Sequence, residues 1–372
     1  MKTTSQPTGY ARLSPWAARG ALVALTLAAG FFLAVAFSPL RQSNVGRQRP
    51  GKGDVALYRA EVERIRAGEG YYEAAAAELT ERGYPTRSVF NWRTPLPMWL
   101  IGRLPAAVFA KALLGAFALG MMLIAFEALA REEDNALRRP VACALLLIGP
   151  LMPCVLADLF VMPVLWAGVF IGLSLCCYGI DRPRLGIAFG LAAVFFRELA
   201  LPYCLLAAAV AVRRRQWGEL LGWTAGLAAW FVFFGWHALR VSALITPEAH
   251  AHAESWLQFA GAGFVISTTQ TNAYLLVLPH WITALYLAAA LFGLAGWNTS
   301  LGTRIGLTAC LFAVGFAAVG QEFNQYWGCL TAPLMCFGVV RFPASLRDAW
   351  QAASIVGATS SWKSKRRAVL AR

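Results

Sequence analysis

The sequence predicts an all-α polytopic membrane protein with about 9–10 transmembrane spans, some of them half-length helices, and an amphipathic helical first outer loop. The 372 residues are 58% hydrophobic and only 14% charged, and the mean hydropathy is +0.55. Apolar runs of about 20 residues alternate with short clusters of Arg and Lys. Soluble domains carry about 25% charged residues. The composition therefore excludes a disordered chain, a coiled coil and a disulfide-stapled secreted module.

The excess of basic residues is consistent with a membrane protein. The chain has 33 Lys and Arg against 19 Asp and Glu, a net charge of +14. In a soluble protein this balance would favour nucleic acid as the partner. Here much of the excess flanks apolar runs, where basic residues fix topology and face anionic lipid. We therefore expect these basic residues to face a lipid bilayer, and we expect no nucleic acid as a partner.

The cysteines and histidines do not form a metal-binding pattern. The 8 cysteines lie within or beside apolar runs and the histidines number 4, with no CxxC pair and no cluster at ligand spacing. His250, His252 and Glu254 in HAHAESW are a weak metal signal and favour a loop over the outer face. We expect small buried thiols, no metal ion and no cofactor.

The apolar runs begin at about residue 17. The run 17–39 is long enough to cross a bilayer and is expected to be an uncleaved anchor. The polar stretch 40–97 follows as a large extracytoplasmic loop. Further apolar runs cover 104–130, 141–157, 159–180, 184–212, 217–237, 272–296, 305–320 and 328–340. This organisation predicts one transmembrane domain over 1–342 and a basic cytoplasmic tail over 343–372.

Basic residues in the short connections give the orientation, because they mark the cytoplasmic side. They place both termini in the cytoplasm. The cluster Arg213 to Arg215 fits this orientation only if the run 184–212 is two half-length helices that meet at Arg197 and Glu198. The basic residues between 41 and 52 oppose the orientation, although long loops follow the rule weakly.

With this topology, polar residues from distant parts of the chain all fall on the outer face. Ionisable groups at or below a membrane surface usually face a cavity or pair with one another, so we expect one polar site there. The set comprises Asp54, Tyr58, Asn91, Arg93, Asp158, Arg197, Glu198, Arg240, Glu248, His250, His252, Glu254, Gln321, Glu322, Asn324 and Tyr326.

The large outer loop has helical periodicity. Tyr58, Val62 and Ile65 recur at i, i+4 and i+7, which predicts an amphipathic helix lying on the membrane. Two glycines break it, and a second helix is expected from Tyr72 to Arg82. The segment 88–102 then re-enters the bilayer through two prolines. The loop is therefore expected to be an ordered cap over the outer face.

The order of motifs in this loop resembles a known enzyme family. An early span is followed by Asp54, Tyr58, the step Gly68 to Tyr71, and Arg93-Thr94-Pro95-Leu96. This arrangement is similar to the polyprenyl-phosphate-mannose-dependent mannosyltransferases of the GT-C superfold. Two positions depart from the family pattern: Asp54 is followed by Val55 instead of a second acid, and Thr94-Pro95 replaces a Tyr-Pro-Pro step. The direct resemblance covers roughly a quarter of the chain.

The resemblance implies a bacterial cytoplasmic-membrane enzyme. It would transfer a hexose, such as mannose, from a polyprenyl-phosphate donor to a glycan or lipid acceptor on the outer face, with inversion. No Gly-rich phosphate loop is evident, which agrees with a lipid donor. Asp54 is the candidate base, and Arg93 and Arg197 the candidate phosphate ligands. The candidate substrate-binding residues are Tyr58, Asp158, Glu198, Glu322 and Asn324.

Each role has a plainer alternative. Asp54 could cap a helix, and Arg93 could anchor at the lipid headgroups. Arg197 could pair with an acid on another helix, since Glu198 is too close in sequence to share its helix face. Asp158 and Glu322 could be hairpin tips that face water.

Two other functions compete with transfer of a sugar. A secondary transporter or lipid flippase would explain a helix broken at a charged pair, although no internal repeat is visible. A non-catalytic scaffold of an envelope-polymer assembly would predict that Asp54 and Arg197 tolerate replacement.

Overall fold

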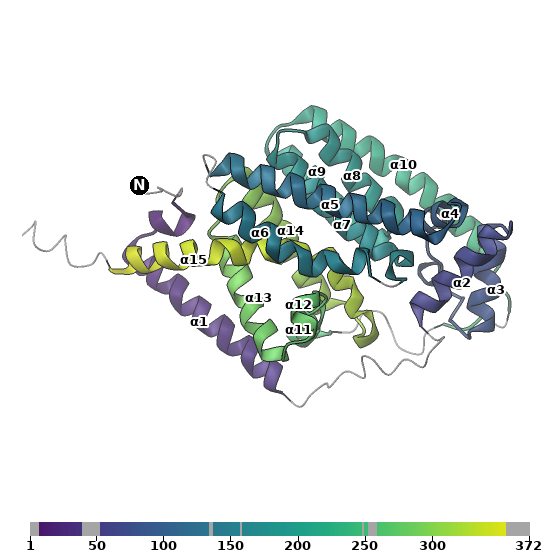
Figure 1. Cartoon of the computed structure of the whole chain (residues 1–372), viewed down its shortest axis with the longest axis horizontal. Helices are drawn as coiled ribbons and strands as arrows, with labels where there is room; N and C mark the ends of the chain where they lie inside the picture. Colours follow the sequence, from purple (N-terminus) through teal and green to yellow (C-terminus); the bar gives the residue numbers. More distant parts are fainter. Residues whose placement is uncertain are drawn as a thin grey trace, which may run out of the picture.

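The computed structural model describes residues 7–38, 53–133, 137–156, 158–247, 249–251 and 259–354, apart from the side chain of Glu322. These residues form helices and no strand (Figure 1). The α-helices are α1 (Pro15–Phe37), α2 (Asp54–Arg66), α3 (Tyr71–Glu81), α4 (Pro95–Arg103), α5 (Ala107–Glu132), α6 (Arg138–Leu151), α7 (Pro163–Gly179), α8 (Pro183–Phe196), α9 (Leu201–Arg213), α10 (Trp217–Ser242), α11 (Gly261–Thr269), α12 (Ala273–Leu276), α13 (His280–Ala295), α14 (Ser300–Ala318) and α15 (Ala332–Ser354). The 3₁₀ helices are η1 (Gly9–Arg12), η2 (Val89–Asn91), η3 (Met152–Cys154), η4 (Leu159–Val161), η5 (Glu198–Ala200) and η6 (Glu322–Leu330).

The helices confirm the prediction of an all-α membrane protein. Within the described residues, 4 helices are long and apolar enough to cross a membrane, namely α1, α5, α10 and α14. The number becomes 5 if the pair Phe323–Leu330 and Ala332–Ser354, bent by 59°, is one span. Shorter apolar helices include α7, α8 and α13.

The predicted break in the run 184–212 is confirmed. Helix α8 ends at Phe196, Arg197 is extended with φ −150° and ψ 118°, and α9 begins at Leu201 with Pro202 in its first turn. A proline at this position lacks an N–H to donate, which suits a helix start. Two other runs are shorter than expected: 141–157 forms α6 and η3, and 272–296 is divided at Pro279 into α12 and α13.

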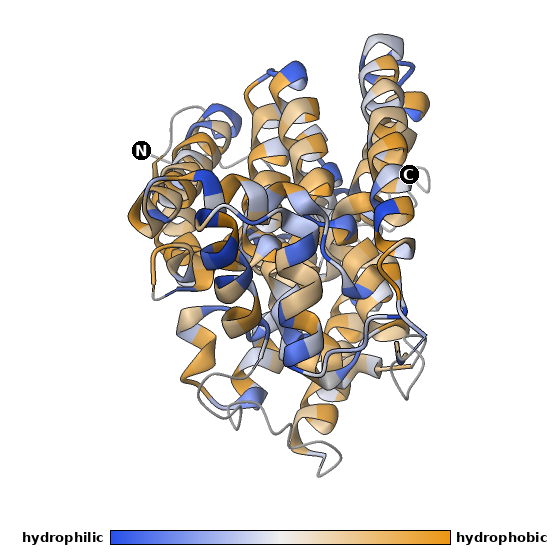
Figure 2. Cartoon of the chain, turned by 90° about the vertical axis from the view of Figure 1, so that its right-hand side faces the viewer, coloured by the Kyte–Doolittle hydropathy of each residue, from blue (hydrophilic) through white to orange (hydrophobic). Residues whose placement is uncertain are grey.

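Helix α7 is the centre of the molecule. Every residue from Pro163 to Cys177 is buried, as expected for a helix that is apolar on all sides. It packs against α5, α8 and α14. Figure 1 shows α2, α3 and α4 together at one end, away from the N-terminus and the end of α15. Figure 2, which faces that end, shows hydrophilic residues of these segments in front of largely hydrophobic helices.

The chain does not change character at the predicted boundary between 342 and 343, because α15 continues through it to Ser354. Arg341, one residue before the boundary, is 5% exposed. Its guanidinium donates to Glu132 at 3.1 Å and to Glu133 at 2.8 Å at the end of α5. The first part of the expected tail is therefore an ordered extension of the last helix, and 355–372 lie outside the described residues.

Helices α13 and α15 approach at two glycines. A Cβ on Gly293 would lie 1.9 Å from the carbonyl oxygen of Gly338, and a Cβ on Gly338 would lie 2.1 Å from the carbonyl oxygen of Ala290. Small residues of this kind allow helix backbones to pack closely in membranes.

We therefore expect Gly293→Ala to destabilise the fold by about 1–3 kcal/mol, because the added methyl must push α15 away. Thermal unfolding in detergent, followed by size-exclusion chromatography, measures the effect. Gly315→Ala in α14 is the matched control, since a Cβ there meets nothing within 4 Å. Equal unfolding temperatures for the two variants would contradict the close approach of α13 and α15.

Candidate functional site

The first residue of α2 provides the carboxylate of the candidate site. Gly53, with φ 105°, is the N-cap of α2, so Asp54 is the first helical residue and not the cap. A positive φ of this size favours glycine. The Asp54 carboxylate instead accepts hydrogen bonds from the hydroxyl of Tyr326 at 2.9 Å and that of Tyr84 at 3.2 Å. The helix start therefore presents Asp54 to η6 and to the end of the outer loop.

Asp54 lines a small polar cavity of about 50 Å³. The walls come from α2, the segment 84–93 and η6, which are far apart in sequence. Six of the predicted polar residues lie in this wall. The lining residues are Asp54, Leu57, Tyr58, Tyr84, Pro85, Asn91, Arg93, Phe323, Asn324 and Tyr326.

Arg93 is held in the cavity wall by neutral groups. Its Nε donates to the Tyr58 hydroxyl at 2.6 Å and its Nη1 donates to the Phe90 carbonyl at 2.7 Å. Burial raises the pKa of Tyr58 well above 10, although the charge of Arg93 acts in the opposite direction. No carboxylate among the described side chains forms an ion pair with Arg93. Although burial acts to lower the pKa of Arg93, the charges of nearby groups, Glu198 and Asp54 among them, raise it well above its ordinary value. Arg93 therefore stays charged without a carboxylate in direct contact among the described side chains.

Arg197 and Glu198 form an ion pair with each other, with 3.3 Å between Nη1 and Oε1. The expectation that their proximity in sequence prevents pairing was wrong, because Arg197 is extended and not helical. Thr94, next to Arg93, donates to the Phe195 carbonyl at 3.2 Å, which ties the end of α8 to the segment before α4. The structure thus brings the two predicted phosphate ligands into one region.

Several buried donors in this region have no hydrogen-bond partner within the part of the chain that the structure describes. They are Nδ2 of Asn324, Nε of Arg197 and Nε1 of Trp327. Asn324 lines the cavity and is 2% exposed, and Arg197 is 4% exposed. An unpaired buried donor is costly. The region is therefore suited to a ligand rich in oxygen acceptors.

Asp158 is not in the cavity, which corrects the prediction that it belongs to the same site. It accepts from Arg59 of α2 at 2.8 Å, and its side chain is 42% exposed. Arg240, another member of the predicted set, stacks over the ring of Tyr72 and lies in a neighbouring groove. The plainer interpretation, a hairpin residue facing water, fits Asp158.

Other expected members of the site are not described in full. The side chain of Glu322 and the whole of Glu248, His252 and Glu254 lie outside the described residues. His250 is exposed, and its carbonyl accepts from the backbone N–H of Arg87 at 3.3 Å.

The sequence interpretation missed Tyr84 and Glu61. Tyr84 follows the expected end of a helix, where nothing marks it as a partner of Asp54. Glu61 had a detectable signal, because it lies three residues after Tyr58 on the face that carries Val62 and Ile65. It is 2% exposed, and burial raises its pKa from 4.5 to about 8.

An apolar groove of about 430 Å³ lies beside the cavity. It is formed by α3, α4 and α10, with Trp99, Phe233 and Trp236 in its wall and Arg240 at its polar side. Tyr71 links the two spaces, since it lines the groove and its hydroxyl donates to the Arg93 carbonyl.

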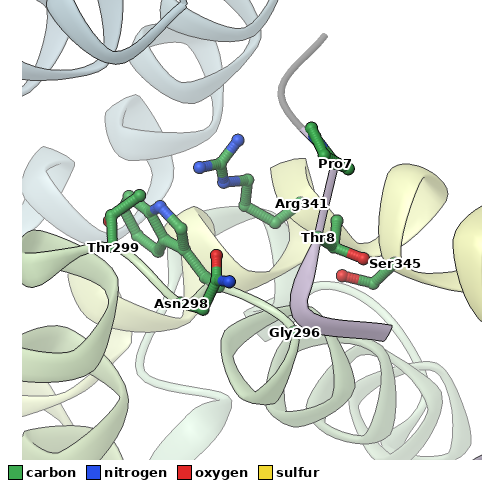
Figure 3. Close-up of a pocket in the computed structure, with 8 residues that line it drawn as sticks. Pro7, Thr8, Gly296, Asn298, Thr299, Arg341 and Ser345 are labelled. Carbon is green, nitrogen blue, oxygen red and sulfur yellow. The ribbon is translucent and has the colours of Figure 1, made fainter. Parts of the chain in front are cut away.

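A second polar space is too small for a sugar. It measures about 10 Å³ and lies around Arg341, Thr8 and Ser345 (Figure 3). Arg341 is already neutralised by Glu132 and Glu133. This cluster joins the start of the chain to α15 and is not a candidate for substrate binding.

Comparison with known protein families, curated proteins and solved structures found no match to this chain. The candidate site therefore depends on the residues and their geometry alone.

Helices α2 and α3, which form one side of the cavity, are joined by Glu78. Its side chain is 7% exposed and accepts from Arg64 at 2.6 Å and from Arg82 at 2.8 Å. Although burial acts to raise the pKa of Glu78, the hydrogen bonds from these arginines lower it below 4.5. Its stabilising contribution is therefore present above pH 4.5 and is lost as the pH falls through the folded-state pKa.

We expect Glu78→Gln to destabilise the protein by about 1–3 kcal/mol at neutral pH, since Arg64 and Arg82 lose the buried carboxylate that they share. Of the described carboxylates, Arg64 keeps only the more exposed Glu69 and Glu81. The loss should shrink as the pH falls through the lowered folded-state pKa of Glu78. Asp158→Asn is the matched control, and its exposed ion pair predicts a change below about 1 kcal/mol. Thermal unfolding of both variants across pH measures this. A loss for Glu78→Gln that stays constant into acid would contradict the assignment.

Proposed function

We propose that this protein is a membrane glycosyltransferase that moves a hexose, such as mannose, from a polyprenyl-phosphate donor to an extracytoplasmic acceptor. The observation that carries the proposal is the cavity lined by both the carboxylate of Asp54 and the guanidinium of Arg93, which forms no ion pair with a described carboxylate. A reaction that removes a proton from a hydroxyl and releases a phosphate needs both groups.

In the proposed reaction, the acceptor hydroxyl oxygen bonds to the anomeric carbon of the donor sugar. The bond between that carbon and the phosphate oxygen breaks, and its electron pair leaves with the phosphate. Asp54 takes the proton of the hydroxyl. Its two tyrosine hydrogen bonds hold the carboxylate in position. A single displacement of this kind inverts the anomeric centre.

Arg93 and Arg197 would bind the phosphate as negative charge develops on it. Arg93 is the stronger candidate, because Arg197 is already paired with Glu198. The unpartnered Nδ2 of Asn324 offers a further donor in the same wall. Tyr58 would hold the Arg93 guanidinium through its hydroxyl.

The apolar groove supports a lipid donor. Its wall of aromatic side chains from α4 and α10 would hold the first isoprenoid units. Tyr71 connects the groove to Arg93, so a phosphate bound at Arg93 would lie beside the isoprenoid chain in the groove. The polar cavity, at about 50 Å³, is far smaller than ligand sites, which measure about 300–1,000 Å³. Sugar binding would therefore require the outer loop and η6 to separate.

We also propose the number and the orientation of the membrane spans. A GT-C-like arrangement with 9–10 spans would count the half-length helices α8 and α9 and the short apolar helices as membrane segments. The orientation in a bacterial cytoplasmic membrane would place both termini in the cytoplasm and the cavity outside. The basic residues of the connections support this orientation.

A transporter or lipid flippase is the second candidate. The observation that favours it is the helix broken at a buried ion pair, Arg197 and Glu198, a feature typical of transporters. A flippase would move the lipid-linked sugar between leaflets and leave the sugar on its carrier. A non-catalytic scaffold would require neither Asp54 nor Arg93.

We expect Asp54→Asn to lower sugar transfer by about 100-fold or more, because the variant lacks the base. Arg93→Met should lower transfer by about 100-fold through weaker stabilisation of the leaving phosphate. Transfer of radiolabelled sugar is measured with purified protein, polyprenyl-phosphate mannose, glucose and arabinose donors, and membrane lipid extract as acceptor.

Asp158→Asn is the control for this experiment and should retain transfer within about twofold, since it lies in an exposed ion pair. Monodisperse elution must show that each variant is folded. Transfer that survives in Asp54→Asn would remove its role as base. Movement of the donor across liposome membranes without transfer of its sugar would support the flippase.

A further inference from the structure

Glu61 is a buried carboxyl group whose Oε2 has no hydrogen-bond partner among the described residues. It lies on the face of α2 that carries Asp54 and Tyr58, at i+7 and i+3 from them, and is 2% exposed. A carboxyl group in this position is expensive to keep ionised, because burial removes its hydration and nothing replaces it.

The charged groups that face Glu61 come from each element packed around it. Arg93 is the strongest of these charges, and Glu78, Asp54 and Arg82 follow. Glu78 is paired with Arg64 and Arg82, which leaves Arg93 as the cation without a described carboxylate partner. The titratable groups around Glu61 are Asp54 and Tyr58 on α2, Tyr71, Glu78 and Arg82 on and next to α3, and Arg93 before α4.

The two protonation states of Glu61 have opposite consequences for Arg93. A neutral carboxyl leaves the guanidinium on the Tyr58 hydroxyl, where it lines the cavity and forms no ion pair with a described carboxylate. An ionised carboxylate without a partner would attract the nearest cation that has no ion pair and would form a buried pair with it. Because burial raises the pKa of Glu61 to about 8, the neutral form predominates at neutral pH.

We propose that Glu61 is a positioning residue for Arg93, which in its neutral form leaves the guanidinium free to bind the phosphate and in its ionised form draws it away from the cavity. The identity of that phosphate as part of a lipid donor rests on the function proposed above. The positioning itself concerns any phosphodiester that binds at Arg93.

The test is the affinity of the purified full-length protein for methyl farnesyl phosphate between about pH 6 and about pH 9.5. This phosphodiester carries a constant single charge over the range. The wild-type affinity should fall about tenfold as Glu61 ionises, a coupling of ordinary size between neighbouring sites. Glu61→Gln, which keeps the shape of the neutral form, should bind as tightly at high pH as at low pH.

Glu63→Gln is the matched control. Glu63 lies on the same helix but its side chain is 61% exposed and pairs with Arg59, so this variant should keep the wild-type pH dependence. Arg93→Met should bind weakly at every pH. Adding Glu61→Gln to Arg93→Met should change nothing further, because Glu61 acts through Arg93.

Infrared spectroscopy supplies a readout that a purely structural role would not move. The wild type should show a carboxylic-acid C=O band at neutral pH that disappears at high pH and is absent from Glu61→Gln. By linkage, saturating phosphodiester should raise the apparent pKa of this band by about one pH unit, which corresponds to the tenfold coupling.

Three results would overturn the proposal: no binding of the phosphodiester at low pH, a wild-type affinity that does not change with pH, or a pH dependence that survives in Glu61→Gln. A different result would contradict the proposed function. If the affinities follow the expected pattern but no donor sugar is transferred, the glycosyltransferase assignment falls and the coupling of Glu61 to Arg93 stands.

Discussion

The rest of the structure depends on one constraint: a polar side chain buried among apolar helices must be paired, or it remains costly. Most buried charges here meet it. Arg341 is paired with Glu132 and Glu133, and the buried Arg304 with Glu219. Glu78 is shared by two arginines. Around the cavity the constraint is met only in part, because Arg93 has no described carboxylate partner and donors of Arg197 and Asn324 remain unpaired. Unpaired Nε atoms also occur, among the described residues, on Arg304 and Arg341. The feature that distinguishes the cavity is therefore Arg93, an arginine that forms no ion pair with a described carboxylate.

The backbone conformation explains why Arg197 and Arg93 differ in their pairing. Arg197 lies where α8 stops, and its extended conformation brings its side chain to that of the next residue. Arg93 lies between η2 and α4, where its nearest partners are a carbonyl and a tyrosine hydroxyl. Charge-assisted bonds to neutral acceptors orient a guanidinium but leave its charge in place. The helix break thus explains why Arg197 pairs with Glu198. The position of Arg93 between η2 and α4 explains why it has only neutral hydrogen-bond partners among the described residues.

Much of the fold could be predicted because apolar length and helix-breaking residues are local signals. The long apolar helix α1, the two helices α2 and α3 and the break at Arg197 all follow from such signals and are confirmed. The convergence of Asp54, Tyr58, Arg93 and Asn324 was also predicted, since the expected topology puts their segments on one side. Asp158 does not line the cavity and pairs with Arg59 instead, because an expected topology predicts a side of the membrane but not the partner of a side chain. Tyr84 and Tyr326 could not be identified as partners of Asp54, because hydroxyl contacts over 30 and 272 residues leave no trace in local pattern.

The unusual position of Glu61 could have been predicted from the helical periodicity of α2. An acid on the apolar face of an amphipathic helix conflicts with the pattern that surrounds it, and such conflicts tend to occur at functional sites. Its neighbours Val62 and Ile65 pack toward α4, where a Cβ on Gly102 would lie 2.6 Å from Ile65. Helix α2 also packs against α3, and the groups that face Glu61 include Tyr71 and Glu78 of that helix. The contacts of α2 with α3 and α4 together keep this face of α2 out of water. Because Arg93 stands just before α4, the contact of α2 with α4 also fixes the position of the segment that carries the arginine.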